Sequence, residues 1–160
     1  MVRRHDRIRD WLARWIGAVS EAEAITEEYV PHWDSVDSEG RVVRARLDVC
    51  FVDQGRQVYM DVAVTESAST SAQELRSRKQ RNAAAAISME DRKRVRYPGP
   101  ALVPFVVEAL GCRGPAASAL LKSLAPADPE ERSVVLAAAR QSLSVLVQTG
   151  NAELMLAAAR

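Results

Sequence analysis

The sequence has few of the features that mark a secreted, membrane-bound or zinc-binding protein. It contains only two cysteines, Cys50 and Cys112, and they form no CxxC pair. Two thiols without a disulfide framework are typical of a reducing compartment and argue against a zinc site. No apolar run approaches the roughly 20 residues of a membrane-spanning helix, and the N-terminus lacks a signal-peptide core. We therefore expect an intracellular protein without membrane contact, nuclear if its source is a eukaryote.

Strong net charge and internal repeats are also lacking. The 160 residues carry 22 Lys and Arg against 21 Asp and Glu, a net charge of +1, so the chain as a whole is no polycation. Its length fits one domain with a real core, and its 48% apolar and 27% charged residues are ordinary for a globular protein. The function must be sought in the arrangement of particular residues.

Two aspartates stand inside the apolar strands of a predicted hairpin. Residues 42–52 and 58–65 are rich in β-branched and apolar residues, and Asp53-Gln54-Gly55 between them is a turn signal. Asp48 lies in the first strand and Asp61 in the second, where an unpaired carboxylate is costly to bury. Two neighbouring carboxylates favour a cation between them, and Mg²⁺ takes such oxygen ligands. The alternative is a pair of surface aspartates on the solvent face of a half-exposed hairpin.

Further elements flank this hairpin on both sides. Apolar spacing predicts a helix over residues 4–20, in which we expect His5 to be exposed, then a strand over residues 23–31 and a loop over residues 32–41. Residues 73–96 are helix-prone, and residues 102–110 predict a strand, with Pro104 near a sheet edge or at a strand start. Two or three helices follow. One covers residues 115–125, and the next runs from Pro129 to about Thr149, where Gly150 is expected to end it. Residues 151–159 would add one or two further turns.

Basic residues are concentrated between the hairpin and the last strand. Only Glu90 and Asp91 oppose a block of eight cations: Arg76, Arg78, Lys79, Arg81, Arg92, Lys93, Arg94 and Arg96. Clustered cations beside a metal site favour a polyanionic partner, because phosphate neutralisation releases counterions. The alternative is a solvated helix face, which charge runs usually form.

The order helix, three strands, helix, strand, with aspartates on the second and third strands, resembles the PD-(D/E)XK restriction-like nuclease superfamily. More narrowly, it is similar to the endonuclease domain of site-specific non-LTR retrotransposons. The matching motifs cover roughly residues 4–111: RLDV, YMDVAV, DRKRVRY with Tyr97, and VPFVVEALG. Leu47 replaces the family's proline, and Ala63 stands where its lysine usually lies. In the retrotransposon branch that lysine is displaced to the following helix.

The resemblance implies metal-dependent hydrolysis of a DNA phosphodiester. Asp48 and Asp61 would hold Mg²⁺ or Mn²⁺, and Lys93 would orient the attacking water or stabilise the phosphate. The rise per residue along a strand and along a helix determines which lysine lies level with Asp61. If the packed helix begins at Ala83, that lysine is Lys93. If the helix begins near Gln73, it is Lys79. We favour Lys93.

Other roles follow from the same resemblance. Glu28 would be a further acidic catalytic residue, with Glu27 equally near in the sequence. The residues expected to bind nucleic acid are Arg76, Arg78, Lys79, Arg81, Arg92, Arg94, Arg96 and Tyr97, although packing is the commoner role of a tyrosine at a helix end. The partner would be DNA, including branched or nicked DNA. The domain would belong to a larger polyprotein.

The expected fold class is α/β. Residues 1–111 would form a restriction-endonuclease-like core, a mixed sheet flanked by helices, and residues 112–160 a helical extension packed on the same domain. The apolar stretch 134–147 fits the core, or else a homodimer interface. Two other functions stay open. The strand that carries Asp61 lacks a DxK or ExK triplet, because Ala63 stands two residues after Asp61. This favours a nuclease fold that binds nucleic acid without cutting it, and the apolar tail would also suit an assembly module.

Overall fold

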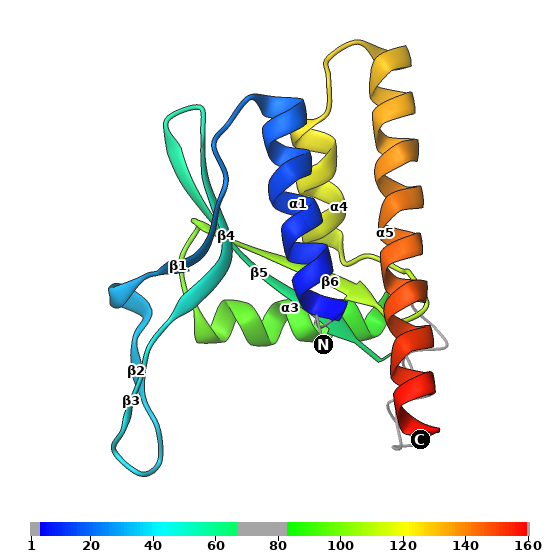
Figure 1. The fold of residues 1–160 in the computed structure, drawn as a ribbon. Coiled ribbons are helices and arrows are strands. Elements are labelled where there is room, and N and C mark those ends of the chain that lie inside the picture. Colours follow the sequence, from blue (N-terminus) through cyan, green and yellow to red (C-terminus); the bar gives the residue numbers. More distant parts are fainter. Residues whose placement is uncertain (1–3, 67–82, 160) are drawn as a thin grey trace.

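A four-stranded mixed sheet lies at the centre of the computed structural model, which describes residues 4–66 and 83–159 (Figure 1). The strands are β1 (Ile25–Tyr29), β4 (Arg46–Asp53), β5 (Arg56–Thr65) and β6 (Leu102–Glu108), in the order β1-β4-β5-β6. The first three are antiparallel neighbours, and β6 runs parallel to β5 at the edge. Pro104 lies on this edge strand, as its missing N–H predicts.

The β4–β5 hairpin has a tight two-residue turn. Gln54 and Gly55 have φ values of 48° and 79°, and a left-handed conformation at both positions is the mark of a type I′ turn. Asp53 pairs with Arg56 across this turn, and the register continues to Val49 opposite Met60. The turn therefore fixes which residues of the two strands face each other further along.

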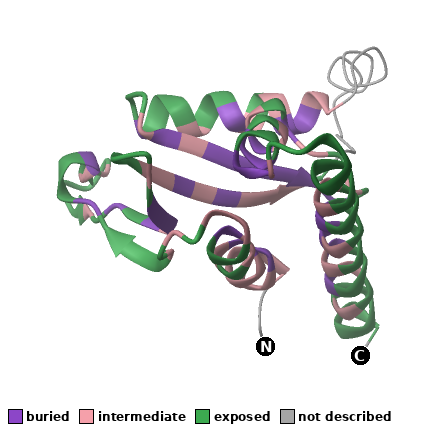
Figure 2. Ribbon diagram, turned by 90° about the horizontal axis from the view of Figure 1, so that it is seen from above, coloured by how far each residue is buried: buried purple, intermediate pink, exposed green. Residues whose placement is uncertain are grey.

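Helices cover both faces of the sheet. In Figures 1 and 2, α3 (Ala84–Arg96) lies on one face, and α1 (Arg4–Ser20) and α4 (Pro115–Leu124) lie on the other. The long helix α5 (Pro129–Ala158) packs against α1. The main core joins α1, the sheet, α4 and α5 and includes Ile8, Leu12, Val49, Met60, Phe105, Leu121, Leu143 and Val147. These elements confirm the predicted α/β class and the predicted α-β-β-β-α-β order with a helical extension.

Residues 32–41 are more ordered than the loop predicted for them. They contain part of a short 3₁₀ helix (Pro31–Trp33) and the strand β2 (Ser35–Val36). This strand forms a small hairpin with β3 (Val42–Val43), which follows directly after residue 41. The carboxylate of Asp37 accepts hydrogen bonds from the backbone N–H groups of Glu39 and Arg41. These bonds close the hairpin, although the segment contains no extended apolar run that would predict a strand. The predicted strand over residues 42–52 is accordingly interrupted before Arg46.

The prediction that Gly150 ends the last helix is wrong. Helix α5 continues through Gly150 to Ala158. Gly150 is buried against α1, where a β-carbon would lie 2.6 Å from Cγ of Arg4. The glycine therefore serves close helix packing, and this contact outweighs its cost of about 1 kcal/mol in a helix interior.

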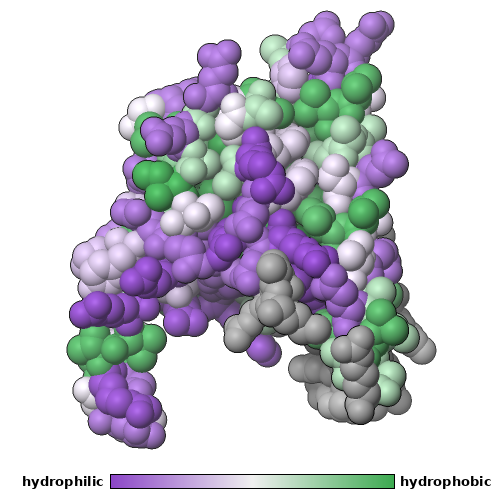
Figure 3. Space-filling view, viewed as in Figure 1, coloured by the Kyte–Doolittle hydropathy of each residue, from purple (hydrophilic) through white to green (hydrophobic). Residues whose placement is uncertain are grey.

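Exposed apolar side chains occur on the small hairpin and along α5. Figure 3 shows hydrophobic surface at both places, and Val36 and Val42 of the hairpin are each 66% exposed. Within residues 134–147, Ala139, Leu143 and Val147 are buried and Val145 is exposed, so part of this stretch serves the core. A homodimer through the C-terminal helices stays a prediction. In the described part of the chain, no helix is both long and apolar enough to cross a membrane.

Candidate active site

Asp48 and Asp61 face each other at the end of the paired region of the central hairpin. The register of β4 and β5 places them one step beyond the pair Val49 and Met60. Their carboxyl groups are close enough to hydrogen bond to each other. Only 13% of the Asp48 side chain and 15% of the Asp61 side chain is exposed, so these are not aspartates on the solvent face of an open hairpin. Two carboxylates thus meet in a largely buried setting.

Both oxygens of Asp48 are engaged. Oδ2 accepts a hydrogen bond of 2.6 Å from the backbone N–H of Val62, on the neighbouring strand. Oδ1 lies 3.1 Å from Nε2 of His5, on the first turn of α1. Burial opposes the ionisation of Asp48, but the hydrogen bond and charge of His5, together with the Val62 amide, lower its pKa below the usual value. Asp48 is therefore held as an oriented carboxylate.

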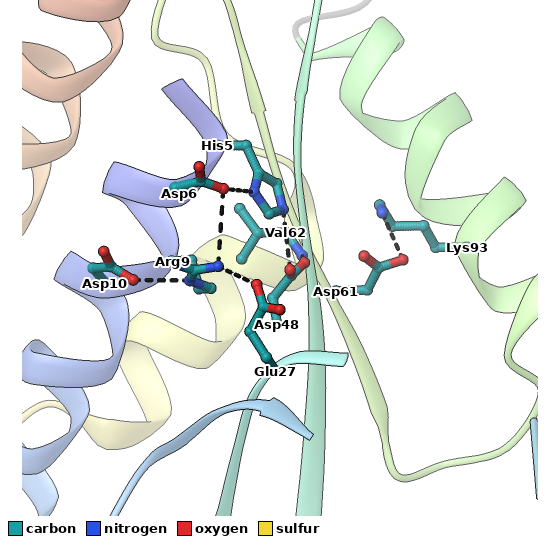
Figure 4. A network of polar contacts seen from close by, with 9 residues as sticks. All are labelled: His5, Asp6, Arg9, Asp10, Glu27, Asp48, Asp61, Val62 and Lys93. Carbon is teal, nitrogen blue, oxygen red and sulfur yellow. Dashed lines mark hydrogen bonds and ion pairs between the residues drawn. The ribbon is translucent and has the colours of Figure 1, made fainter. Parts of the chain in front are cut away.

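His5 connects helix α1 to this carboxylate, and the expectation that it is exposed is wrong. Its side chain is 34% exposed, and its Nδ1 lies 3.0 Å from Oδ1 of Asp6 (Figure 4). The hydrogen bond to Asp48, opposed by burial and assisted by Asp6, raises the pKa of His5 to about 9. His5 lies three residues before Ile8, on the face that packs on the sheet, and this spacing was the available signal for its position.

Lys93 reaches the second carboxylate from the opposite side of the sheet. Its Nζ lies 2.6 Å from Oδ2 of Asp61, and both side chains are largely buried (Figure 4). Burial is the largest influence on Asp61 and raises its pKa; Lys93 counteracts this effect, the nearby Asp48 adds to it, and the net pKa is raised. Carboxyl groups this close titrate as a coupled pair. The Asp48–Asp61 pair therefore lies between a cation from α1 and a cation from α3.

The position of Lys93 follows from where α3 begins. The helix starts at Ala84, preceded by Ala83 in a left-handed conformation with a φ of 59°. The carboxylate of Glu108, at the end of β6, accepts hydrogen bonds from the N–H groups of Ala85 and Ala86 at 3.1 and 3.2 Å. These bonds satisfy amides that a helix start leaves without partners and anchor α3 to the sheet. Of the two alternatives for the catalytic lysine, the helix start agrees with Lys93, while Lys79 lies outside the described residues.

The acidic residues Glu27 and Glu28 lie on β1, the strand next to β4. The register between β1 and β4 places Glu27 level with Asp48, and it places Glu28 opposite Leu47. Glu27 has a left-handed φ of 60° and is bonded to Arg9 of α1. Glu28 is exposed. Figure 4 shows Glu27 beside Asp48, between the aspartate pair and Arg9.

The residues expected to bind nucleic acid fall into three groups. Arg92, Arg94 and Arg96 are exposed on α3, while Tyr97 is buried against the ring of Trp33, with 5.5 Å between ring centroids. The role of Tyr97 in this structure is therefore packing. The remaining residues, Arg76, Arg78, Lys79 and Arg81, lie outside the described part of the chain.

The donor set at this site suits a hard divalent cation better than zinc. No group of three or more His, Cys, Asp or Glu side chains within residues 4–66 and 83–159 is arranged to hold a metal. Mg²⁺ commonly uses one or two protein carboxylates and completes its shell with water and substrate phosphate, whereas structural zinc needs four protein ligands. The Asp48–Asp61 pair supplies two carboxylates and so fits the magnesium pattern. A bound cation would also favour the ionised form of Asp61, whose pKa is raised by its surroundings.

Comparison with known proteins adds no relative. No protein-family model matches the chain, and no curated protein matches it.

Proposed function

We propose that this protein is a metal-dependent endodeoxyribonuclease that nicks DNA and forms part of a retrotransposon-type polyprotein. The observation that supports the proposal most is the contact between Lys93 and Asp61 at 2.6 Å, beside Asp48. A lysine from a helix reaches the carboxylate pair although the strand position two residues after Asp61 holds Ala63. This agrees with the displaced lysine that the sequence motifs led us to expect.

Each residue of the site has a definite part in the proposal. Asp48 and Asp61 would hold Mg²⁺ or Mn²⁺, which when bound activates water and stabilises charge on phosphate oxygens. Lys93 donates hydrogen bonds to the attacking water or to the phosphate as negative charge develops there. His5 fixes the Asp48 carboxylate from α1, while the Val62 amide fixes it from the sheet.

DNA contact is assigned to the cations of and before α3. Arg92, Arg94 and Arg96 are exposed on the same helix that carries Lys93. A phosphate backbone bound along this helix would place a scissile phosphate near Asp61. Binding of this kind is electrostatic and independent of sequence, so target choice would belong to other parts of the polyprotein.

A second function is favoured by a specific observation. With Ala63 in place of the usual strand lysine, and with His5 and Lys93 bonded directly to the aspartates, the fold would also serve as a nucleic-acid-binding or assembly module without catalysis. In that case the four side chains form a structural ion-pair network in which the charges balance.

A nicking assay separates the two functions. Supercoiled plasmid and branched DNA are incubated with the protein in Mg²⁺, Mn²⁺ or EDTA. The nuclease proposal requires nicked product with a divalent ion and none in EDTA. If the protein binds both DNA forms but cuts neither with Mg²⁺ or Mn²⁺, the non-catalytic function replaces it.

A further inference from the structure

A second concentration of positive charge surrounds a cavity outside the candidate active site. The cavity has a volume of about 290 Å³ and lies between α4 and the first half of α5. Three of its lining residues are cations from three parts of the chain: Arg113, which precedes α4, Lys122 of α4 and Arg140 of α5. The remaining lining residues are Ser118, Leu121 and Leu136. Among the described residues, no carboxylate lines this cavity.

These cations lack anionic partners in the described part of the chain. The side chains of Arg113 and Lys122 form no ion pair with residues 4–66 or 83–159, and Arg140 donates through Nε to the backbone oxygen of Leu136 at 3.3 Å. Burial, followed by the positive charge of Arg140, lowers the pKa of Arg113 below its usual value. Converging like charges in a partly buried cavity destabilise the empty site, and an anion would relieve that repulsion.

We propose that this cavity binds a phosphate group. Guanidinium groups present paired N–H donors that match phosphate oxygens, a lysine adds a compact positive charge, and the hydroxyl of Ser118 is a further donor. Leu121 and Leu136 supply apolar walls, which strengthen charge interactions beside them. The volume lies just below the range of about 300–1,000 Å³ in which sites for drug-sized ligands fall. It suits a phosphate or the phosphorylated end of a ligand.

The phosphate has two chemical sources, a free small anion or the backbone of DNA. Neither depends on Asp48, Asp61 or Lys93, so this site goes beyond the proposed nuclease and stands or falls separately. All measurements are made in EDTA, which removes divalent ions from the Asp48–Asp61 pair.

The test is calorimetric titration of the full chain with inorganic phosphate and pyrophosphate at fixed ionic strength. Arg140→Gln and Lys122→Gln alter exposed helix positions, so the fold should persist. Each should weaken binding about tenfold, because each removes a charged donor to the phosphate. Arg140→Glu should abolish binding. Arg14→Gln is the matched control: it removes the same charge from an exposed position of α1 that does not line the cavity, and should bind phosphate as the wild type does.

A short DNA duplex added as competitor distinguishes the sources. Displacement of phosphate assigns the site to the DNA backbone, and undiminished phosphate binding assigns it to a free anion; both support a phosphate site. Absence of binding by wild type to phosphate, pyrophosphate and duplex overturns it, as does equal weakening in Arg14→Gln and Arg140→Gln. Asp48→Ala should bind phosphate normally, which keeps this result separate from failure of the nuclease proposal.

Discussion

In the described part of the chain, one pair of acidic residues is buried, Glu90 and Glu108, and another is largely buried, Asp48 and Asp61. The partners of the two pairs differ. Glu108 and Glu90, 6% and 1% exposed, accept hydrogen bonds from backbone amides at the starts of α3 and α4. Asp48 and Asp61 instead face each other, and apart from the Val62 amide that donates to Asp48, their partners are the side chains of His5 and Lys93. Backbone amides are fixed by the helices that contain them, whereas side-chain cations can move when a ligand arrives. Burial alone therefore does not distinguish a functional carboxylate from a structural one.

The glutamate pair also shows how tightly a structural carboxylate is enclosed. A β-carbon at Gly114 would lie 1.9 Å from Oε1 of Glu90, so the glycine leaves room for that carboxylate at the start of α4. Burial raises the pKa of Glu90, and the Ala116 amide and Arg94 reduce the effect only in part. The main influences on the pKa of Glu90 are burial, backbone amides and Arg94, in contrast to Asp61, where Asp48 adds to the rise in pKa.

The largest expected effect comes from removing either aspartate. Asp48→Ala and Asp61→Ala should each lower nicking by roughly a thousandfold, because several kcal/mol of charge stabilisation are lost with the metal site. Calorimetry with Mn²⁺ should show binding by wild type and none by either variant. Glu90→Gln, which alters a carboxylate of the other pair, should bind Mn²⁺ normally. If both aspartate variants bind Mn²⁺ like wild type, the distinction between the pairs is lost.

Lys93→Met should have the next largest effect. Nicking should fall by about a hundredfold to a thousandfold, as expected for loss of one donor to developing charge, while binding of Mn²⁺ and DNA persists. The neighbouring variant Arg92→Gln, at an exposed position of α3, should retain activity per bound DNA. A fully active Lys93→Met together with an inactive Lys79→Ala would transfer the catalytic role to Lys79.

For the glutamate pair we expect a loss of stability instead of activity. Glu108→Leu removes the acceptor for the Ala85 and Ala86 amides and should lower the free energy of unfolding by about 2 kcal/mol. Glu108→Gln retains an acceptor oxygen and should cost less. Urea unfolding measures both, and Mn²⁺ affinity at temperatures where the variants are folded should equal that of wild type. Reduced Mn²⁺ affinity in folded Glu108→Leu would show that the two pairs are coupled.

The sequence predicted one of these pairs better than the other. Asp48 and Asp61 could be recognised because each interrupts an apolar strand and the turn at Gln54-Gly55 fixes their register. The start of α3 was left open between two alternatives, because it depends on Glu108, a residue distant in sequence whose carboxylate caps the helix. Local propensity does not contain that contact.

Helix packing accounts for the two residues that sequence reasoning placed wrongly. Gly150 is a helix terminator by propensity, yet the side chain of Arg4 lies against it and the helix continues. His5 is polar and near the chain start, which favours exposure, but α1 lies on the sheet with this turn beside Asp48. Both outcomes depend on how α1 docks, and docking is set by the shape of the whole core.

The smallest expected effect is a pH dependence of stability that belongs to the aspartate pair alone. The pKa of His5 rises from 6.5 to about 9 on folding, so its ion pair with Asp48 stabilises the protein fully below pH 6.5. That contribution is lost as the pH rises through about 9. We compare wild type with His5→Gln, whose amide can still donate to Asp48 but carries no charge. In EDTA, urea unfolding should show wild type more stable at pH 6, by less than about 1 kcal/mol because the pair is partly exposed. The difference should shrink towards zero above pH 9.

Arg7→Gln, which removes an ion pair with Glu153 between α1 and α5, is the matched control and should show no such change over this range. A wild-type advantage that is constant from pH 6 to above 9 would mean that His5 is not charged against Asp48, and the aspartate pair would then have a single cation, Lys93.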